Sequence, residues 1–288
     1  MRLRYRLLNV FARAGDPFSG NPLCVFEDSA GLDDALMQGL ARQFNLSETS
    51  FIVEARRGRA SADGEDAAVR IFTTTFEMPF AGHPTLGTAH VVREVLDAGD
   101  RVRLSMPAGV IPVEAAGDFW TLTARPGTVE RELDADEVAA AVGLGPDDLV
   151  GPVQLVSTGS AQVIAQASSP DAVRRAVGDG RLMRRHGAMG MRGGEALIYL
   201  WAPSGPDSVL ARALVSEGTA VTEDPATGSA CSNLGAWLVA QGRTGIAWEI
   251  SQGDQTGRPS TLHLTVTDEG TVQVGGLVRV VGWGEVVL

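Results

Sequence analysis

Residues 77–89 read EMPFAGHPTLGTA, and residues 223–230 read EDPATGSA. Each stretch has an acidic residue, a proline and a turn of small residues with one glycine and one polar side chain, and each leads into an apolar, helix-like segment. The start of a helix presents backbone N–H groups that have no partner inside the helix, which suits it to bind a carboxylate. Two such helix starts, far apart in the chain, predict two domains that close on one small anionic ligand.

The composition is that of an ordinary globular protein with enough residues for about two domains. The chain has 288 residues, of which 44% are hydrophobic and 20% are charged. The net charge of −11 argues against nucleic acid or an anionic membrane surface as a partner, although a small acid can still bind where the local charge is positive. No apolar run approaches the ~20 residues that span a bilayer. We predict that residues 1–10 form a strand rather than a signal peptide, so a cytoplasmic location is expected.

Cysteine and histidine usage predicts neither a disulfide framework nor a metal site. Cys24 and Cys231 lack any metal-type spacing. The histidines His90, His186 and His263 show no ligand spacing with one another. The glycine-rich residues 187–194 lack both the P-loop lysine and the dinucleotide fingerprint, so we interpret them as a flexible loop. We expect no cofactor and no metal.

The hydrophobic pattern predicts an α+β chain, because short strands dominate and helices are few. Expected strands lie at 5–11, 23–26, 49–54, 69–73, 102–106, 110–114, 120–123, 153–157, 162–167, 196–201, 211–215, 248–251, 261–267, 271–274 and 278–281. Expected helices lie at 33–44, 134–142 and 170–176 and directly after His83 and Ser229. A break near residues 124–127 separates a first domain, 1–124, from a second, 125–277, and the C-terminal strand 278–288 is a candidate to complete the first.

A weak internal repeat favours two equivalent halves. Residues 19–25, SGNPLCV, parallel residues 158–164, TGSAQVI, and Gly82-His83 parallels Gly228-Ser229. The two offsets are similar but not identical, as in a diverged duplication. Each predicted domain is therefore rich in strands and has one prominent apolar helix.

Four segments together resemble one known family. Residues 20–22 (GNP), 45–51 (NLSETSF), 79–89 and 223–230 occur in the order found in the PhzF family, the phenazine-biosynthesis isomerases related in fold to diaminopimelate epimerase. The resemblance implies two pseudo-symmetric domains, each a strongly curved, barrel-like sheet around a central helix, with the active site in the interdomain cleft. It also implies a homodimer that needs no cofactor.

The resemblance carries roles for individual residues. It implies that Glu48 is the acid/base carboxylate and that His83 and Asp224 are further catalytic groups. It implies substrate-binding roles for Gly20, Asn21, Gly82, Gly228 and Ser229. The two catalytic cysteines of the epimerase relatives correspond to Ala81 and Ala226, which disfavours racemisation by two thiols. The run that follows Thr158-Gly159 departs from the family's more apolar pattern at Ser160-Ala161-Gln162, which bears on the shape of the pocket.

The chemistry of these residue types suits a double-bond shift. Such a shift takes a proton from one carbon and returns one to another, and one carboxylate can do both if burial raises its pKa toward neutrality. Glu48 precedes the apolar residues 51–53 and can be buried in this way. His83 can hydrogen-bond the substrate or assist proton transfer, and Asp224 can bind an ammonium or hydroxyl group. The N–H groups of the two glycine turns can bind a carboxylate or stabilise an enolate-like charge.

Each residue also has a purely structural interpretation. Glu48 can be a solvated loop residue and Asp224 a helix cap, and we expect Glu77 and Glu223 to be structural. The favoured function is a cofactor-independent isomerase of a small unsaturated cyclic or conjugated amino (imino) acid, in antibiotic or phenazine-like secondary metabolism. Two alternatives stay open: an amino-acid epimerase with His83 as its second base, and a non-catalytic small-molecule binding protein.

Overall fold

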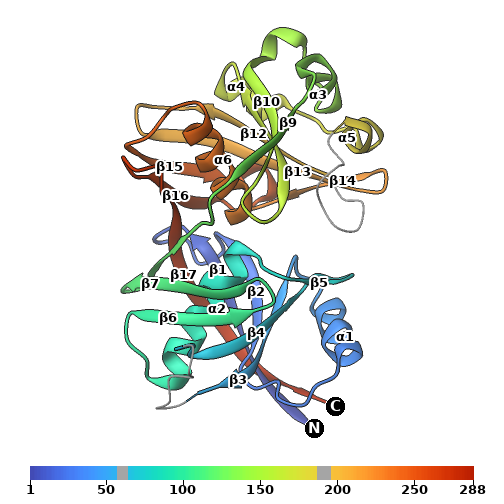
Figure 1. Ribbon diagram of the computed structural model, residues 1–288. Coiled ribbons are helices and arrows are strands. Elements are labelled where there is room, and N and C mark those ends of the chain that lie inside the picture. Colours follow the sequence, from blue (N-terminus) through green and yellow to red (C-terminus); the bar gives the residue numbers. More distant parts are fainter. Residues whose placement is uncertain (57–63, 187–195) are drawn as a thin grey trace. The chain divides into compact units, whose positions relative to one another are not determined.

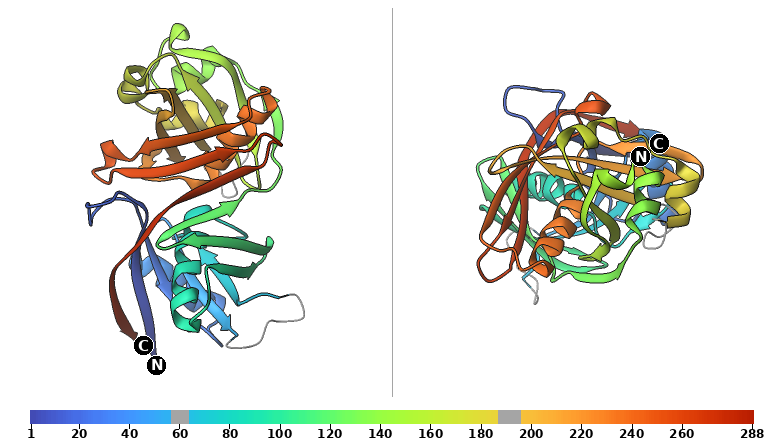
Figure 2. Two further views of the ribbon diagram at one scale, coloured as in Figure 1. Left: turned by 90° about the vertical axis from the view of Figure 1, so that its left-hand side faces the viewer. Right: turned by 90° about the horizontal axis from the view of Figure 1, so that it is seen from above.

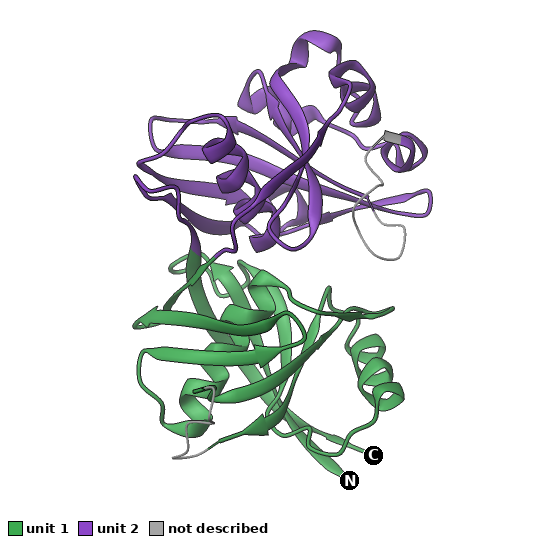
Figure 3. Cartoon of the chain, viewed as in Figure 1, with its two compact units in different colours: residues 1–123, 275–288 green, residues 124–274 purple. Residues whose placement is uncertain are grey.

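A computed structural model describes residues 1–56, 64–186 and 196–288, which divide into two units (Figures 1 and 3). Unit 1 comprises Met1–Thr123 and Gly275–Leu288, and unit 2 comprises Ala124–Val274. The predicted loop at 187–194 lies outside the described residues.

Unit 1 surrounds the helix α2 (Gly82–Leu96) with strands. Its other elements are β1 (Arg2–Ala12), β2 (Asn21–Phe26), α1 (Asp34–Phe44), β3 (Thr49–Ala55), β4 (Ala67–Phe72), β5 (Glu77–Met78), β6 (Arg101–Met106), β7 (Gly109–Ala116), β8 (Phe119–Thr123) and most of β17 (Val272–Val287). Strand β17 pairs with both β1 and β8, which closes the ring of strands into a barrel. Figure 2 shows β1 and β17 side by side, with both chain ends at one edge of the unit.

Unit 2 surrounds the helix α6 (Gly228–Ala240) in the same manner. Its strands are β9 (Thr128–Glu132), β10 (Leu149–Ser157), β11 (Ala161–Ala167), β12 (Ala196–Pro203), β13 (Ser208–Glu217), β14 (Ala220–Asp224), β15 (Ile246–Gln252) and β16 (Ser260–Val266). Its other helices are α3 (Ala135–Ala141), α4 (Pro170–Arg175) and α5 (Gly180–His186), with short 3-10 turns at Pro146–Asp148 and Asp254–Thr256.

The two units share one order of strand pairing, which confirms the predicted pseudo-symmetric α+β fold. In unit 1 the successive pairs are β1–β2 antiparallel, β2–β3 parallel, β3–β4 and β4–β5 antiparallel, β4–β6 parallel and β6–β7 antiparallel. In unit 2 the strands β10 to β16 repeat this series pair by pair. In both units the central helix follows the short fifth strand of the series.

The central helices are buried almost all round, as expected for a helix enclosed by a sheet. In α2 every residue from Gly82 to Val92 is buried, and in α6 all but one from Gly228 to Leu238 are. Small residues permit this close approach: a Cβ atom on Gly87 would lie 2.5 Å from the Leu23 side chain and 3.0 Å from that of Val10. The strands of unit 1 therefore pack directly on the backbone of α2.

Several elements differ from the sequence-based expectation. The two strands expected at 271–274 and 278–281 are one continuous strand, β17. Gly275 does not interrupt it. A glycine is needed there because a Cβ atom would lie 2.8 Å from the Trp120 carbonyl oxygen. The pattern also missed β5, β9, β14 and α5. Strand β9 is exposed at every residue, so its sequence shows no alternation, and its pairing with β10 holds it in place.

Candidate active site

Glu48 lies at the end of a turn whose geometry follows from the sequence before it. Helix α1 ends at Phe44, and Asn45 takes the left-handed conformation (φ 53°) that often terminates a helix. Strand β3 begins four residues later, at Thr49, so Glu48 is the last residue before a buried strand. Its side chain is 16% exposed, and its Oε2 atom is buried without a hydrogen-bond partner in the described parts of the chain.

Burial changes the acidity of this carboxyl group. It raises the pKa of Glu48 to about 7, although a hydrogen bond from Ser47 opposes the shift. The Ser47 hydroxyl also lies 3.3 Å from Oδ1 of the buried Asn21. Asn21 opens β2 directly after Gly20, which has a φ of +84° in the turn. The predicted binding residues Gly20 and Asn21 are thus connected to Glu48 through Ser47.

His83 is the second polar group beside this carboxylate. It lies in the first turn of α2, is 5% exposed, and places Nε2 3.6 Å from Oε2 of Glu48. The preceding Gly82 is the first residue of the helix, and the cap residue Ala81 provides no side-chain acceptor for the first N–H groups. Unit 1 therefore brings together Glu48, His83 and the start of a buried helix.

Unit 2 gathers the other predicted residues on the turn that starts α6. Asp224 is the last residue of β14, and Gly228 and Ser229 are the first two residues of the helix. Thr227, the cap residue, donates its hydroxyl to Oδ2 of Asp224 over 2.6 Å. The fully buried Gln252 in turn donates to the Thr227 hydroxyl (3.0 Å) and to the Asp224 backbone carbonyl (2.8 Å). This network holds the Asp224 carboxylate beside the helix start.

Two buried amides near this turn were not among the candidate site residues predicted from the sequence. Gln252 closes β15, and the side chain of Gln162, on β11, donates to the Ser229 hydroxyl over 2.8 Å. Gln162 was visible only as a departure from the family's apolar pattern. Neither glutamine belongs to a motif of reactive residues, so only their burial and hydrogen bonds in the folded chain indicate that they support this turn.

The acidic residues that open the two motifs, which we expect to be structural, each form an ion pair within their own unit. Glu77 on β5 pairs with Arg70 on β4 (2.6 Å), and Glu223 on β14 pairs with Arg212 on β13 (2.7 Å). The two ion pairs occupy equivalent strands of the two units. Arg212 also donates to three carbonyl oxygens at the end of α4, those of Val173, Arg174 and Ala176.

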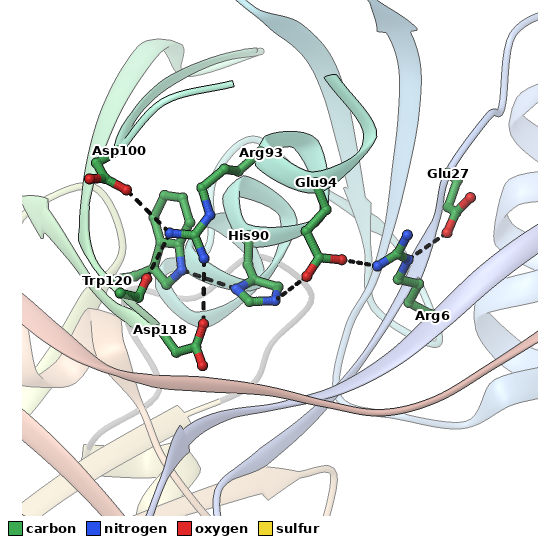
Figure 4. A network of polar contacts seen from close by, with 9 residues as sticks. Arg6, Glu27, His90, Arg93, Glu94, Asp100, Asp118 and Trp120 are labelled. Atoms are coloured by element: carbon green, nitrogen blue, oxygen red, sulfur yellow. Dashed lines mark hydrogen bonds and ion pairs between the residues drawn. The ribbon is translucent and has the colours of Figure 1, made fainter. Parts of the chain in front are cut away.

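A further polar network lies at the other end of α2 (Figure 4). The indole of Trp120 donates to Nδ1 of the buried His90 (3.2 Å), whose Nε2 lies 3.4 Å from Glu94. Burial lowers the pKa of His90, while the Glu94 carboxylate opposes this shift. Arg6 extends the network to the partly buried Glu27, and Arg93 extends it to the exposed Asp100. Both ring nitrogens of His90 therefore face protein side chains, those of Trp120 and Glu94.

Thiol and metal chemistry find little support among the described residues. Cys24 and Cys231 are both buried, and burial raises the pKa of each thiol, which disfavours the reactive thiolate. In the described ranges no group of three histidine, cysteine, aspartate or glutamate side chains could hold a metal ion.

No described helix is long and apolar enough to cross a membrane.

Comparison with known proteins identifies the family. A sequence profile described as "Phenazine biosynthesis-like protein" (PhzC-PhzF) matches residues 8–284. The chain belongs to the PhzF family. It is 35% identical to an uncharacterized isomerase of Pasteurella multocida, over 98% of this chain and 93% of that one. It is also 31% identical to the trans-2,3-dihydro-3-hydroxyanthranilate isomerase of Pseudomonas fluorescens, over 99% of both chains.

The fold agrees with solved PhzF structures. A PhzF family protein of Bacillus anthracis superposes with a TM-score of 0.82 over the whole of both chains, at 22% identity. The predicted family and fold class are thus confirmed, and the chain is an isomerase of the PhzF family.

Proposed function

We propose that this protein moves a proton, and with it a double bond, within a small unsaturated cyclic or conjugated amino (imino) acid, with Glu48 as the general acid/base. The observation that carries the proposal is the buried Glu48 carboxyl group with a pKa of about 7. A group with this pKa is present in both protonation states near neutral pH, so it can take a proton and return it. The reaction then needs only groups of the chain itself.

His83 and the α6 turn complete the proposed machinery. His83 lies 3.6 Å from Glu48 and acts as a hydrogen-bonding partner of the substrate or of the carboxylate during proton transfer. Asp224 accepts a hydrogen bond from the substrate's ammonium or hydroxyl group. The starts of α2 and α6 supply N–H groups at Gly82 and Gly228 for a carboxylate or for enolate-like charge.

The substrate class follows from the relatives. The Pseudomonas fluorescens relative is named for trans-2,3-dihydro-3-hydroxyanthranilate, an amino acid with a ring diene. We propose a substrate of the same chemical class for this chain, with a role in antibiotic or phenazine-like biosynthesis. We further propose a cytoplasmic homodimer, which sedimentation at several protein concentrations would test.

The epimerase alternative is less well supported. Inversion at an α-carbon needs two bases on opposite faces of that carbon. Glu48 and His83 instead lie beside each other, and both thiols are buried. A single carboxylate on one face suits transfer between two carbons of the same substrate.

The test is proton NMR in deuterium oxide with a panel of conjugated amino and imino acids, trans-2,3-dihydro-3-hydroxyanthranilate first. We expect the wild type to give a moved double bond with deuterium at a new carbon, and Glu48→Gln to give neither. Exchange only at the α-carbon with loss of optical purity would establish the epimerase instead. Tight binding with no exchange for any compound would favour the binding protein.

A further inference from the structure

The side chain of Asn233, on α6, has its hydrogen-bond polarity fixed by the backbone. The backbone N–H of Thr158 donates to Asn233 over 2.8 Å, so the accepting atom must be the amide oxygen, Oδ1. The Thr158 hydroxyl donates to the same oxygen. The Asn233 amide nitrogen is consequently a donor, and it reaches the Ser160 carbonyl and the Gln162 side chain, each at 2.8 Å.

The direction of the Asn233 hydrogen bonds also fixes the direction of the hydrogen bond between Gln162 and Ser229. Because Asn233 donates to Gln162, the contacting atom of Gln162 is its oxygen, and its nitrogen points to the Ser229 hydroxyl at 2.8 Å. Gln162 and Asn233 are 2% and 0% exposed, so water does not compete for these bonds. The Ser229 oxygen accepts a hydrogen bond from Gln162, so the hydroxyl hydrogen of Ser229 is free to bind another acceptor. We call the chain of hydrogen bonds through Asn233, Gln162 and Ser229 the relay. Ser229 is partly exposed, so that acceptor can come from solution.

In the neighbouring network of Gln252, Thr227 and Asp224, a backbone N–H again fixes the direction of the hydrogen bonds, but here the last group is an acceptor. The backbone N–H of Thr227 donates to Gln252 (3.3 Å), so Gln252 presents its nitrogen to the Thr227 hydroxyl. Thr227 must then donate its own hydrogen, and it does so to Asp224. One turn therefore presents a carboxylate acceptor at Asp224 and a hydroxyl donor at Ser229, which matches a ligand that carries both a donor group and an anion.

We propose that Gln162 is a positioning residue which, with Asn233, holds Ser229 as a hydrogen-bond donor to the anionic group of the substrate. The inference rests on the proposed function, because it takes the ligand to be a small carboxylic acid. It assigns the carboxylate to Ser229 and the amino or hydroxyl group to Asp224. It also explains why a polar side chain occupies a buried position of β11.

Gln162→Glu tests this polarity with almost no change of shape. In this variant the ionised carboxylate at position 162 still accepts from Asn233, but it also accepts from Ser229, so the serine hydrogen turns inward and the ligand loses its donor. We expect the dissociation constant of anthranilate, a stable aromatic amino acid, to rise about 10-fold or more at pH 8. At pH 6 binding should partly recover, since the protonated carboxyl group of the variant can donate to Ser229 again. Calorimetry provides the measurement.

Matched variants separate positioning from general damage. Ser229→Ala should weaken binding as much as Gln162→Glu, and the double variant should be no weaker than the worse single one, because both remove the same donor. Gln241→Glu is the control: Gln241 donates to Gln154 at the exposed far end of α6 and should bind like the wild type. Wild-type affinity of Gln162→Glu at pH 8 would overturn the inference.

A measurement without ligand keeps the inference separate from the proposed function. If the wild type binds no acid, the proposed function fails, but the relay can still be tested by NMR of protein labelled with ¹⁵N-glutamine. We expect the side-chain amide protons of Gln162 to exchange with solvent about 10-fold or more slowly than those of Gln241, and faster in Ser229→Ala. Equal exchange at the two glutamines would overturn the relay.

Discussion

At the scale of single residues, the protein places charged and polar groups in surroundings that set their protonation and hydrogen-bond direction. Asn45, in the left-handed conformation, ends helix α1, and the turn that follows places Glu48 directly before a buried strand. Burial raises the pKa of Glu48 to about 7. Asp224 and Ser229 sit on one turn, but buried amides make one an acceptor and leave the other a donor. The pKa of Glu48 and the hydrogen-bond directions of Asp224 and Ser229 are thus set by the groups around them.

The raised pKa of Glu48 predicts a pH-dependent stability that needs no substrate to measure. Between its ordinary pKa of 4.5 and about 7 the folded protein holds a proton that the unfolded chain releases, so stability falls as the pH rises through this window. Glu48→Gln removes this loss and should be more stable than the wild type at pH 8, by about 3 kcal/mol. Urea unfolding at pH 8 and pH 4 measures the difference.

At pH 4, where Glu48 is protonated in both states, the two proteins should have similar free energies of unfolding. Glu54→Gln, on the exposed end of β3, is the matched control and should track the wild type at both values. Equal stability of the wild type and Glu48→Gln at pH 8 would mean that the carboxylate is solvated.

The Thr227 hydroxyl should govern substrate binding through Asp224. Thr227→Val keeps the shape but removes the hydrogen bond to the carboxylate and leaves the Gln252 amide without that acceptor. We expect KM to rise about 10-fold with a smaller change in kcat, and the free energy of unfolding to fall by roughly 1–3 kcal/mol. Thr227→Ser should restore both; a Thr227→Val enzyme with unchanged KM would contradict the role of this hydroxyl.

At the scale of elements, the first turns of the two enclosed helices carry four of the proposed site residues, which are Gly82, His83, Gly228 and Ser229. Much of this was predictable: both helix starts, most strands and the two glycine-polar turns follow from periodicity and turn residues. Strand β9 and helix α5 were not, because short or exposed elements lack a hydrophobic period and depend on tertiary pairing. The contact between Gln162 and Asn233 could not be predicted, since only the folded chain brings residues about 70 positions apart together.

The close packing on α2 predicts opposite effects for two glycine-to-alanine changes. Gly87→Ala places a methyl group 2.5 Å from Leu23 and should lower the free energy of unfolding by about 1–3 kcal/mol. Gly39→Ala, in the exposed face of α1 with no atom within 4 Å, should raise it by roughly 0.5–1 kcal/mol. Thermal and urea unfolding compare the two. A stabilising Gly87→Ala would show that the strands do not enclose the helix tightly.

At the scale of the whole molecule, one strand series appears twice and has diverged in its details. The ion pair between the fourth and fifth strands is present in both units, but Arg212 and Glu223 are each 11% exposed, whereas Arg70 and Glu77 are 24% and 30% exposed. Both units thus have the ion pair that holds the acidic motif, and it is more deeply buried in unit 2.

This difference predicts unequal costs for equivalent changes. Arg212→Ala removes the partner of a buried carboxylate and the donor to three carbonyl groups, so it should cost about 3–5 kcal/mol. Arg70→Ala, at the better solvated pair, should cost about 1 kcal/mol. The double variant Arg212→Met/Glu223→Leu should recover the part of the loss that comes from the unpaired carboxylate, but not the part that comes from the three carbonyl groups. Equal costs in urea unfolding would contradict the difference in burial.

If the buried Glu48 carboxyl group, with its pKa of about 7, moves the proton, the rate of the reaction should follow its ionisation. The rate of solvent-deuterium incorporation into trans-2,3-dihydro-3-hydroxyanthranilate, or into the best substrate of the panel, is followed by NMR between pH 5 and pH 9. Because the reaction starts with an ionised carboxylate, the rate should rise with pH and level off above about 7, and Glu48→Gln should show no incorporation. A rate independent of pH, or one that survives in Glu48→Gln, would show that Glu48 does not move the proton.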